Sequence, residues 1–112
     1  MKIIKTLTGL KSVTALALVG ALASPAASAE TQQKHCENVA SIAHSVMALH
    51  QMGVSLSETL SAITDDSMDA DSVIALNNLT LLAYDSPRYL TEAAQERSAA
   101  TFRDQMHVIC LS

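Results

Sequence analysis

The sequence predicts an all-α fold, a small antiparallel bundle of about four helices closed by one disulfide between the first and last helix. Residues 30–112 contain a single glycine, Gly53, a single proline, Pro87, and no alternating run rich in Val, Ile and Thr. Two cysteines, Cys36 and Cys110, lie near the two ends of the same stretch. A chain of 112 residues is long enough for one small domain.

The first helix is predicted from about Gln33 to Met52. Gly53 follows it as a stop, because glycine readily adopts the left-handed conformation found after helix C-termini. Seven residues share one face at helical spacing and form the predicted core stripe of this helix: Cys36, Val39, Ala40, Ala43, Val46, Met47 and His50.

A short second helix is predicted to begin at Ser55. Ser55 and Glu58 have the spacing of a capping box, in which side chains satisfy the free backbone N–H groups of a helix start. The apolar positions of this helix are Leu56, Leu60 and Ile63. An acidic loop at 65–71 follows it.

The third helix is predicted from about Ser72 to Tyr84, and we expect it to be the most buried element. Its apolar side chains occur on nearly every side of the helix, a pattern typical of a buried helix. They are Val73, Ile74, Leu76, Leu79, Leu81 and Leu82.

The fourth helix is predicted from near Thr91 to Cys110, and its core stripe consists of Ala99, Phe102, Met106 and Ile109. Short connections favour antiparallel packing of successive helices. With four helices, the start of the first then lies beside the end of the fourth, which is where the two cysteines are.

Residues 1–29 have the pattern of a cleaved signal peptide. Three lysines in the first eleven residues precede an apolar stretch at 13–22, Pro25 interrupts it, and small residues at 27–29 suit a signal peptidase. The alternative is an uncleaved anchor, but the apolar stretch is shorter than the ~20 residues that a spanning helix needs. We therefore expect residues 30–112 to form a single helical domain in the periplasm or outside the cell, without a stable membrane anchor.

Cys36 and Cys110 predict one disulfide, because an even cysteine count in an oxidising compartment indicates pairing. Closing so long a loop stabilises a fold by roughly 4 kcal/mol on the chain-entropy view. The alternative is a tetrahedral zinc site that adds His35 and His107 to the two cysteines. We expect the disulfide, and no metal.

The expected exported part, residues 30–112, is acidic. Four basic residues against eleven acidic ones give it a formal charge of −7. Such a surface repels nucleic acid and anionic lipid and favours a cationic partner. The alternative explanation is that the acids serve solubility alone.

The acidic loop does not meet the requirements of a calcium site. If Asp65 is the first ligand, Ala70 stands where the calcium-binding loop needs glycine, and Leu76 where it needs glutamate. Asp69 or Asp71 is instead expected to cap the third helix. No serine lies in a nucleophile elbow, and we expect neither catalytic residues nor a cofactor.

The most distinctive segment is 82–89, which holds two of the three aromatic residues and an arginine around a proline. Tyrosine and arginine often anchor protein interfaces, so Tyr84, Pro87, Arg88 and Tyr89 are candidate interaction residues. In the alternative, these residues are architectural. Tyr84 then closes the core, Pro87 stops the helix, and Arg88 bonds nearby carbonyl or carboxylate groups.

The order of these motifs resembles a set of small exported helical proteins with two cysteines, found in proteobacterial and phage genomes. The resemblance rests on the first cysteine, the HQMGVS run at 50–55, the AYxxPRY pattern at 83–89, Phe102 and the last cysteine. It implies a helical fold closed by a disulfide and carries no known activity. In that set an arginine is more common at the position of His50. A charge there would depend on pH in this chain, which makes His50 a candidate pH-sensitive residue. The alternative is a hydrogen-bonded histidine at the edge of the core, without a role in pH sensing.

Two functions are compatible with these features. The first is a non-enzymatic interaction protein of the bacterial envelope that binds a protein partner, such as an immunity-like protein or a phage-encoded envelope modulator. The alternative is an acid-stress periplasmic chaperone, since such chaperones are also small, helical, exported and disulfide-closed. Eleven acids and four histidines make the stability of this chain sensitive to pH.

Overall fold

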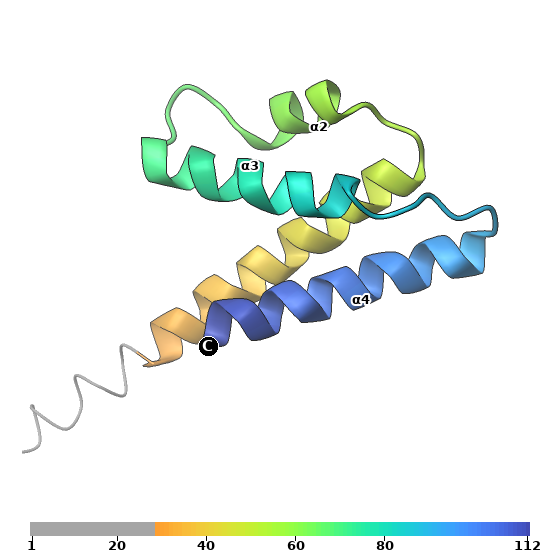
Figure 1. Ribbon diagram of the computed structural model, residues 1–112. Helices are drawn as coiled ribbons and strands as arrows, with labels where there is room; N and C mark the ends of the chain where they lie inside the picture. Colours follow the sequence, from red (N-terminus) through yellow and green to blue (C-terminus); the bar gives the residue numbers. More distant parts are fainter. Residues whose placement is uncertain (1–28) are drawn as a thin grey trace, which may run out of the picture. The chain divides into compact units, whose positions relative to one another are not determined.

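The computed structural model describes residues 29–112, which are helical apart from turns and loops (Figure 1). The predicted signal peptide at 1–29 lies, except for its last position, outside the described residues. The chain divides into two compact units, one up to His35 and one from Cys36 to Ser112. Within the first unit, residues 29–35 are described and helical.

The second unit is an all-α bundle of four helices, as the sequence predicts. The first helix ends at Gln51, and α2 (Leu56–Ile63), α3 (Ala70–Tyr84) and α4 (Glu92–Leu111) follow it. Successive helices run in opposite directions, and α4 lies antiparallel to the first helix with extensive contacts (Figure 1). None of the helices at 29–112 is long and apolar enough to cross a membrane.

Local side-chain caps set three of the helix starts. The Ser55 hydroxyl accepts a hydrogen bond from the backbone N–H of Glu58 at 3.1 Å and so begins α2, as predicted. The Asp69 carboxylate accepts from the N–H of Ser72 at 3.0 Å, which lets α3 begin at Ala70, two residues earlier than predicted. The Thr91 hydroxyl caps α4 in the same way.

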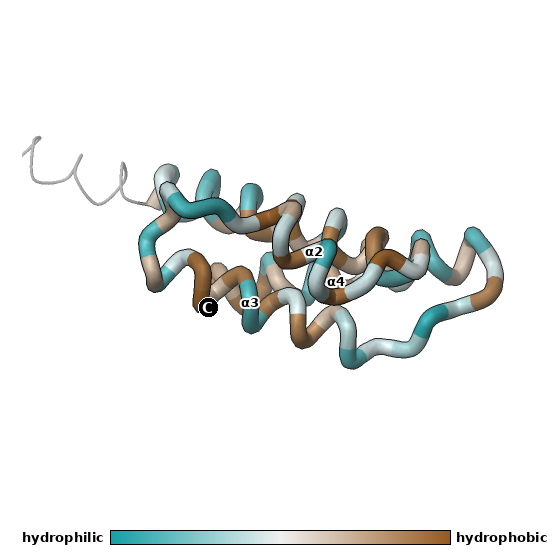
Figure 2. The backbone as a smooth tube through the Cα atoms, turned by 90° about the horizontal axis from the view of Figure 1, so that it is seen from above, coloured by the Kyte–Doolittle hydropathy of each residue, from teal (hydrophilic) through white to brown (hydrophobic). Residues whose placement is uncertain are grey.

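The core lies between the first helix and α4, with a contribution from the end of α3. The first helix supplies Ala43, Val46 and Met47 to the core cluster, which confirms the centre of its predicted stripe. The other members are Leu79, Ala83, Ala99, Phe102 and Met106. Hydrophobic and hydrophilic positions alternate along the helices, as Figure 2 shows, because each helix buries only one face.

The prediction that α3 is the most buried helix is wrong. Only Leu79, Thr80 and Ala83 of this helix are buried, whereas Ile74, Leu81 and Leu82 are each more than half exposed. In so small a bundle α3 is covered on one side, by the first helix and α2, so apolar residues on its other sides face outward. The expectation that Ile109 lies in the core of α4 is also wrong. Ile109 is near the end of α4 and is 62% exposed.

The predicted disulfide is present between Cys36 and Cys110, with the Cα atoms 5.5 Å apart. It joins the first helix to α4, and Cys36 is fully buried. The zinc alternative is excluded, because both thiols are consumed by the bond. No cluster of metal-ligating side chains occurs elsewhere at 29–112. The bond indicates an oxidising environment outside the cytoplasm.

Removing the disulfide should lower the free energy of unfolding by about 4 kcal/mol, because the open chain regains the conformational entropy of a loop that spans 74 positions. Urea denaturation followed by circular dichroism measures this for the oxidised protein and for a Cys36→Ser, Cys110→Ser double variant. Equal midpoints for the two proteins would contradict the expectation.

Candidate functional site

In the connection between α3 and α4, residues 85–91, the backbone at 87–89 is bonded to the buried side chain of Gln51. Its amide nitrogen donates to the carbonyl oxygen of Pro87 at 2.9 Å, and its amide oxygen accepts from the N–H of Tyr89 at 2.8 Å. Gln51 is the last helical residue before Gly53 and is 2% exposed. Its side chain therefore pairs with the 87–89 backbone much as a neighbouring strand would.

A second set of bonds ties the same region to α2. The Tyr84 hydroxyl donates to the carbonyl oxygen of Val54 at 2.7 Å and lies 2.6 Å from the hydroxyl of the buried Thr59. Because the tyrosine proton is used on Val54, Thr59 acts as the donor to Tyr84. Tyr84 thus fastens the end of α3 to the start of α2, which is the architectural alternative for this residue.

His50 belongs to this network. Its Nε2 atom lies 2.7 Å from the carbonyl oxygen of Ser86, and its ring packs against that of Tyr84 with centroids 4.3 Å apart. A carbonyl only accepts, so Nε2 carries the proton in this bond. His50 is 9% exposed, and its predicted pH sensitivity stays a prediction.

Arg88 lies over the end of the first helix. Its Nη2 atom donates to the carbonyl oxygen of Gln51 at 3.4 Å, which partly satisfies a free carbonyl at the helix C-terminus. Gly53 has a φ of +89°, and a Cβ atom added there would lie 2.8 Å from Nη2 of Arg88. Glycine is favoured at position 53 because of this left-handed backbone, whereas the end of the flexible Arg88 side chain could shift to admit a Cβ atom.

Tyr89 differs from Tyr84, because its backbone is fixed and its side chain is not. Besides the bond to Gln51, its carbonyl oxygen accepts from the Gln95 side chain at 2.8 Å. Its ring is 43% exposed, and its hydroxyl has no hydrogen-bond partner within residues 29–112. Tyr89 is thus presented rigidly and remains free to contact another molecule.

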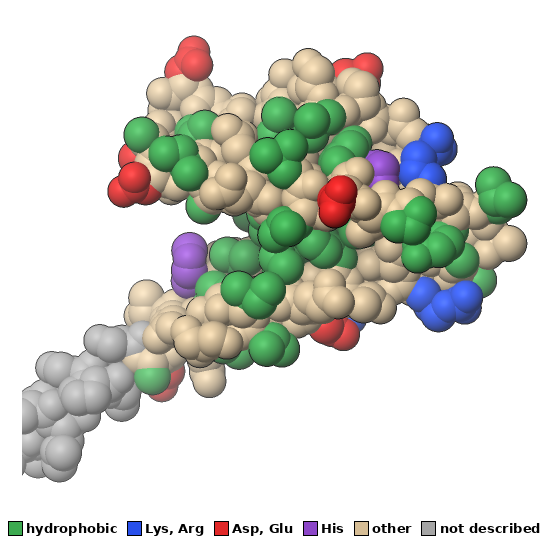
Figure 3. All heavy atoms as spheres, in the orientation of Figure 1, with side chains coloured by type: hydrophobic (Ala, Val, Ile, Leu, Met, Phe, Trp, Pro, Cys, Tyr) green, Lys and Arg blue, Asp and Glu red, His purple; other side chains and the backbone are tan. Residues whose placement is uncertain are grey.

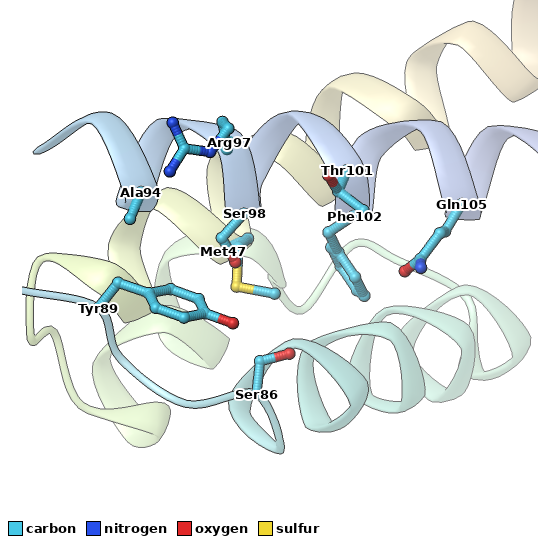
Figure 4. A pocket seen from close by; sticks show the side chains of 9 residues that line it. All are labelled: Met47, Ser86, Tyr89, Ala94, Arg97, Ser98, Thr101, Phe102 and Gln105. Atoms are coloured by element: carbon cyan, nitrogen blue, oxygen red, sulfur yellow. The ribbon is translucent and has the colours of Figure 1, made fainter. Parts of the chain in front are cut away.

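The Tyr89 ring forms one wall of a cleft beneath α4, with a volume of about 420 Å³ (Figure 4). Met47 of the first helix and Ser86 also line the cleft. The opposite wall is one face of α4, with residues spaced three or four apart: Ala94, Arg97, Ser98, Thr101, Phe102 and Gln105. The cleft exists because three of these side chains are small and Tyr89 is held away from the helix.

This cleft and a second hollow at the start of α4 are lined by side chains of opposite charge. Arg97 lines the cleft, and no carboxylate does. The second hollow, of about 470 Å³, is lined by Glu92 and Glu96 and by no basic residue. The Glu96 carboxylate also lies 3.1 Å from Nε2 of His44. The two hollows therefore suit ligand groups of opposite charge.

The sequence-predicted interaction residues occupy one region, but with different roles. Tyr84 is used by the fold, while Pro87, Arg88 and Tyr89 are on the surface, and Arg88 also bonds the first helix. Sequence analysis missed Gln51. This residue lies within the HQMGVS run, but nothing in the local sequence pattern indicates that its side chain bonds the 87–89 backbone. It also missed the α4 face of the cleft, whose small residues at helical spacing were the available signal.

The acidic loop has only local interactions. The Asp65 carboxylate accepts from the hydroxyl and the backbone N–H of Ser67, and these bonds lower the pKa of Asp65 below its ordinary value of 3.8. The Ser72 hydroxyl and N–H lower the pKa of Asp69 in the same way. Both carboxylates thus stabilise turns or a helix start, in agreement with the expected cap.

No protein-family model matches the chain, and neither a curated protein sequence nor a solved structure shows significant similarity to it. The resemblance to small exported proteins with two cysteines therefore stays a prediction.

Replacing Gln51 by leucine should lower the free energy of unfolding by about 2 to 4 kcal/mol, because the Pro87 carbonyl and the Tyr89 N–H lose their partner. Urea denaturation measures the loss. Gln95→Leu is the matched control, since it removes one bond to the same turn at a more exposed position, and it should cost less than half as much. A Gln51→Leu protein as stable as the unaltered one would contradict the role assigned to this side chain.

Proposed function

We propose that this chain is a small non-enzymatic exported protein, periplasmic or secreted, that acts by binding a protein partner. The observation that carries the proposal is the fixed backbone of Tyr89 combined with its free ring and hydroxyl at the edge of a cleft. Tyrosine on a pre-organised turn binds at low entropic cost. Immunity-like proteins and phage-encoded envelope modulators are the classes of protein that this description fits.

The charge of the chain supports a cationic partner. The formal charge of −7 over residues 30–112 steers basic proteins toward the surface and repels nucleic acid and anionic lipid. The hollow at Glu92 and Glu96 offers two carboxylates to a lysine or arginine of such a partner. Export is supported by the disulfide and by the leader pattern of the sequence.

Capture from a periplasmic or culture-supernatant fraction tests the proposal. The oxidised protein should retain a partner that an Arg88→Ala, Tyr89→Ala double variant retains at least about tenfold less, as expected for the loss of interface anchors. Tyr89→Ala alone guards against effects of Arg88 on the fold. The control is Leu82→Ala, which changes an exposed apolar residue of α3. Identical captures by all these proteins would refute the 86–89 turn as the interface.

The second candidate, an acid-stress chaperone, is favoured by exposed apolar side chains. Large hydrophobic residues at the surface suit the binding of unfolded clients. Five examples are Ile74, Leu81, Leu82, Leu90 and Val108. Figure 3 shows hydrophobic side chains on both the α2–α3 layer and α4.

Acid should loosen this fold. Asp65 and Asp69 have lowered pKa values, so the stability they contribute is present above their ordinary value of 3.8 and is lost as pH falls through the lowered values. The chaperone proposal expects partial unfolding and suppression of client aggregation at about pH 2 to 3. Circular dichroism of this protein measures the unfolding, and light scattering of an acid-denatured client measures the suppression of aggregation.

The Asp69→Asn variant is the matched control for the acid transition. Asparagine also caps helices but does not titrate, so this variant should unfold at lower pH than the unaltered protein. A chain that stays fully folded and does not prevent aggregation at pH 2 excludes the chaperone function.

A further inference from the structure

The cleft beneath α4 contrasts with the chemistry of the rest of the chain. Acidic residues outnumber basic residues eleven to four at 30–112, yet the cleft has one arginine and no carboxylate among its lining residues. Arg97 makes no ion pair within the described part of the chain, whereas Arg103, six residues further along α4, is bonded to Asp104 at 3.0 Å. The guanidinium of Arg97 is therefore available to a ligand.

The inside of the cleft is partly apolar and partly polar. Met47 and Phe102 are buried core residues, and both also line the cleft. Figure 4 shows their side chains directed into it, together with the Tyr89 ring. The hydroxyls of Ser98 and Thr101 have no partner within residues 29–112. A volume of about 420 Å³ is within the range of sites that hold small organic molecules or a few residues of peptide.

We propose that this cleft binds a carboxylate carried on a short apolar group. The apolar group contacts Met47 and Phe102, and the carboxylate accepts hydrogen bonds from Arg97 at the mouth. The Arg97 side chain lies along α4 near Ala94 (Figure 4). It is exposed and unpaired, so turning toward a ligand breaks no existing ion pair.

Two sources carry this chemistry, the C-terminus of a polypeptide that ends in an apolar residue and a free small organic acid. The polypeptide source rests on the proposed function, because it makes the cleft the place where the partner's last residue binds. Capture of a terminal carboxylate by a cation and backbone or hydroxyl groups is a known mode of peptide recognition.

A titration of the oxidised, ¹⁵N-labelled protein followed by NMR tests the proposal. The probes are acetyl-Gly-Gly-Leu with a free carboxylate, the same peptide as its C-terminal amide, and 4-methylvalerate. The free peptide should shift the amide resonances of Tyr89, Ser98 and Thr101. The amidated peptide should bind at least about fivefold more weakly, because it lacks the charge that Arg97 recognises.

Substitutions at Arg97 test whether its guanidinium binds the carboxylate. Arg97→Gln should weaken binding of the free peptide at least about fivefold without changing the melting temperature, and Arg97→Lys should retain part of the affinity. Arg103→Gln is the matched control on the same helix and should bind like the unaltered protein. Tighter binding of the peptide than of 4-methylvalerate identifies a polypeptide C-terminus, and equal binding identifies a small organic acid.

The proposal is overturned if no probe shifts the cleft resonances, if acid and amide bind equally, or if Arg97→Gln has no effect. Its failure is distinguishable from failure of the proposed function. A protein that binds the free peptide through Arg97 but captures no partner refutes the proposed function alone. A protein that captures its partner through Tyr89 but binds no carboxylate refutes the cleft proposal alone.

Discussion

The buried amide of Gln51 is the interaction on which the rest of this site depends. Within the connection between α3 and α4, Gln51 supplies a donor to the Pro87 carbonyl and an acceptor to the Tyr89 N–H. With the 87–89 backbone fixed, Arg88 can reach the end of the first helix, and the ring of Tyr89 stands away from α4. The bonds of Gln51 and Gln95 to Tyr89 thus fix one wall of the cleft, and small side chains on α4 line the other.

The two ends of the first helix within the bundle are secured by different means. Cys36 is bonded covalently to α4 at one end, and at the other end His50 and Gln51 hold the α3–α4 connection by hydrogen bonds. The fifteen residue steps from Cys36 to Gln51 span about 22 Å. The apolar core lies between these two points, so a small core is closed at both ends. That arrangement suits a protein that needs rigidity with few buried residues.

An acidic surface attracts basic molecules over a distance of about 10 Å, whereas the groups that line a hollow act only at contact. The hollow at Glu92 and Glu96 matches the attraction. The cleft beside Arg97 has the opposite preference. A basic partner with a free carboxylate satisfies both, which links the proposed function to the chemistry proposed for the cleft.

The sequence by itself determined the helices, their order and the disulfide. Ser55 and Gly53 act through local capping and backbone conformation, and the disulfide was predictable because the chain has only two cysteines to pair. It did not determine which sides of α3 are covered, because a helix apolar all round gives no direction to its packing, and Leu81 faces outward as a result. Only the tertiary structure decided the site. Gln51 meets Pro87 and Tyr89 across 36 and 38 positions of sequence, a pairing that no local pattern specifies.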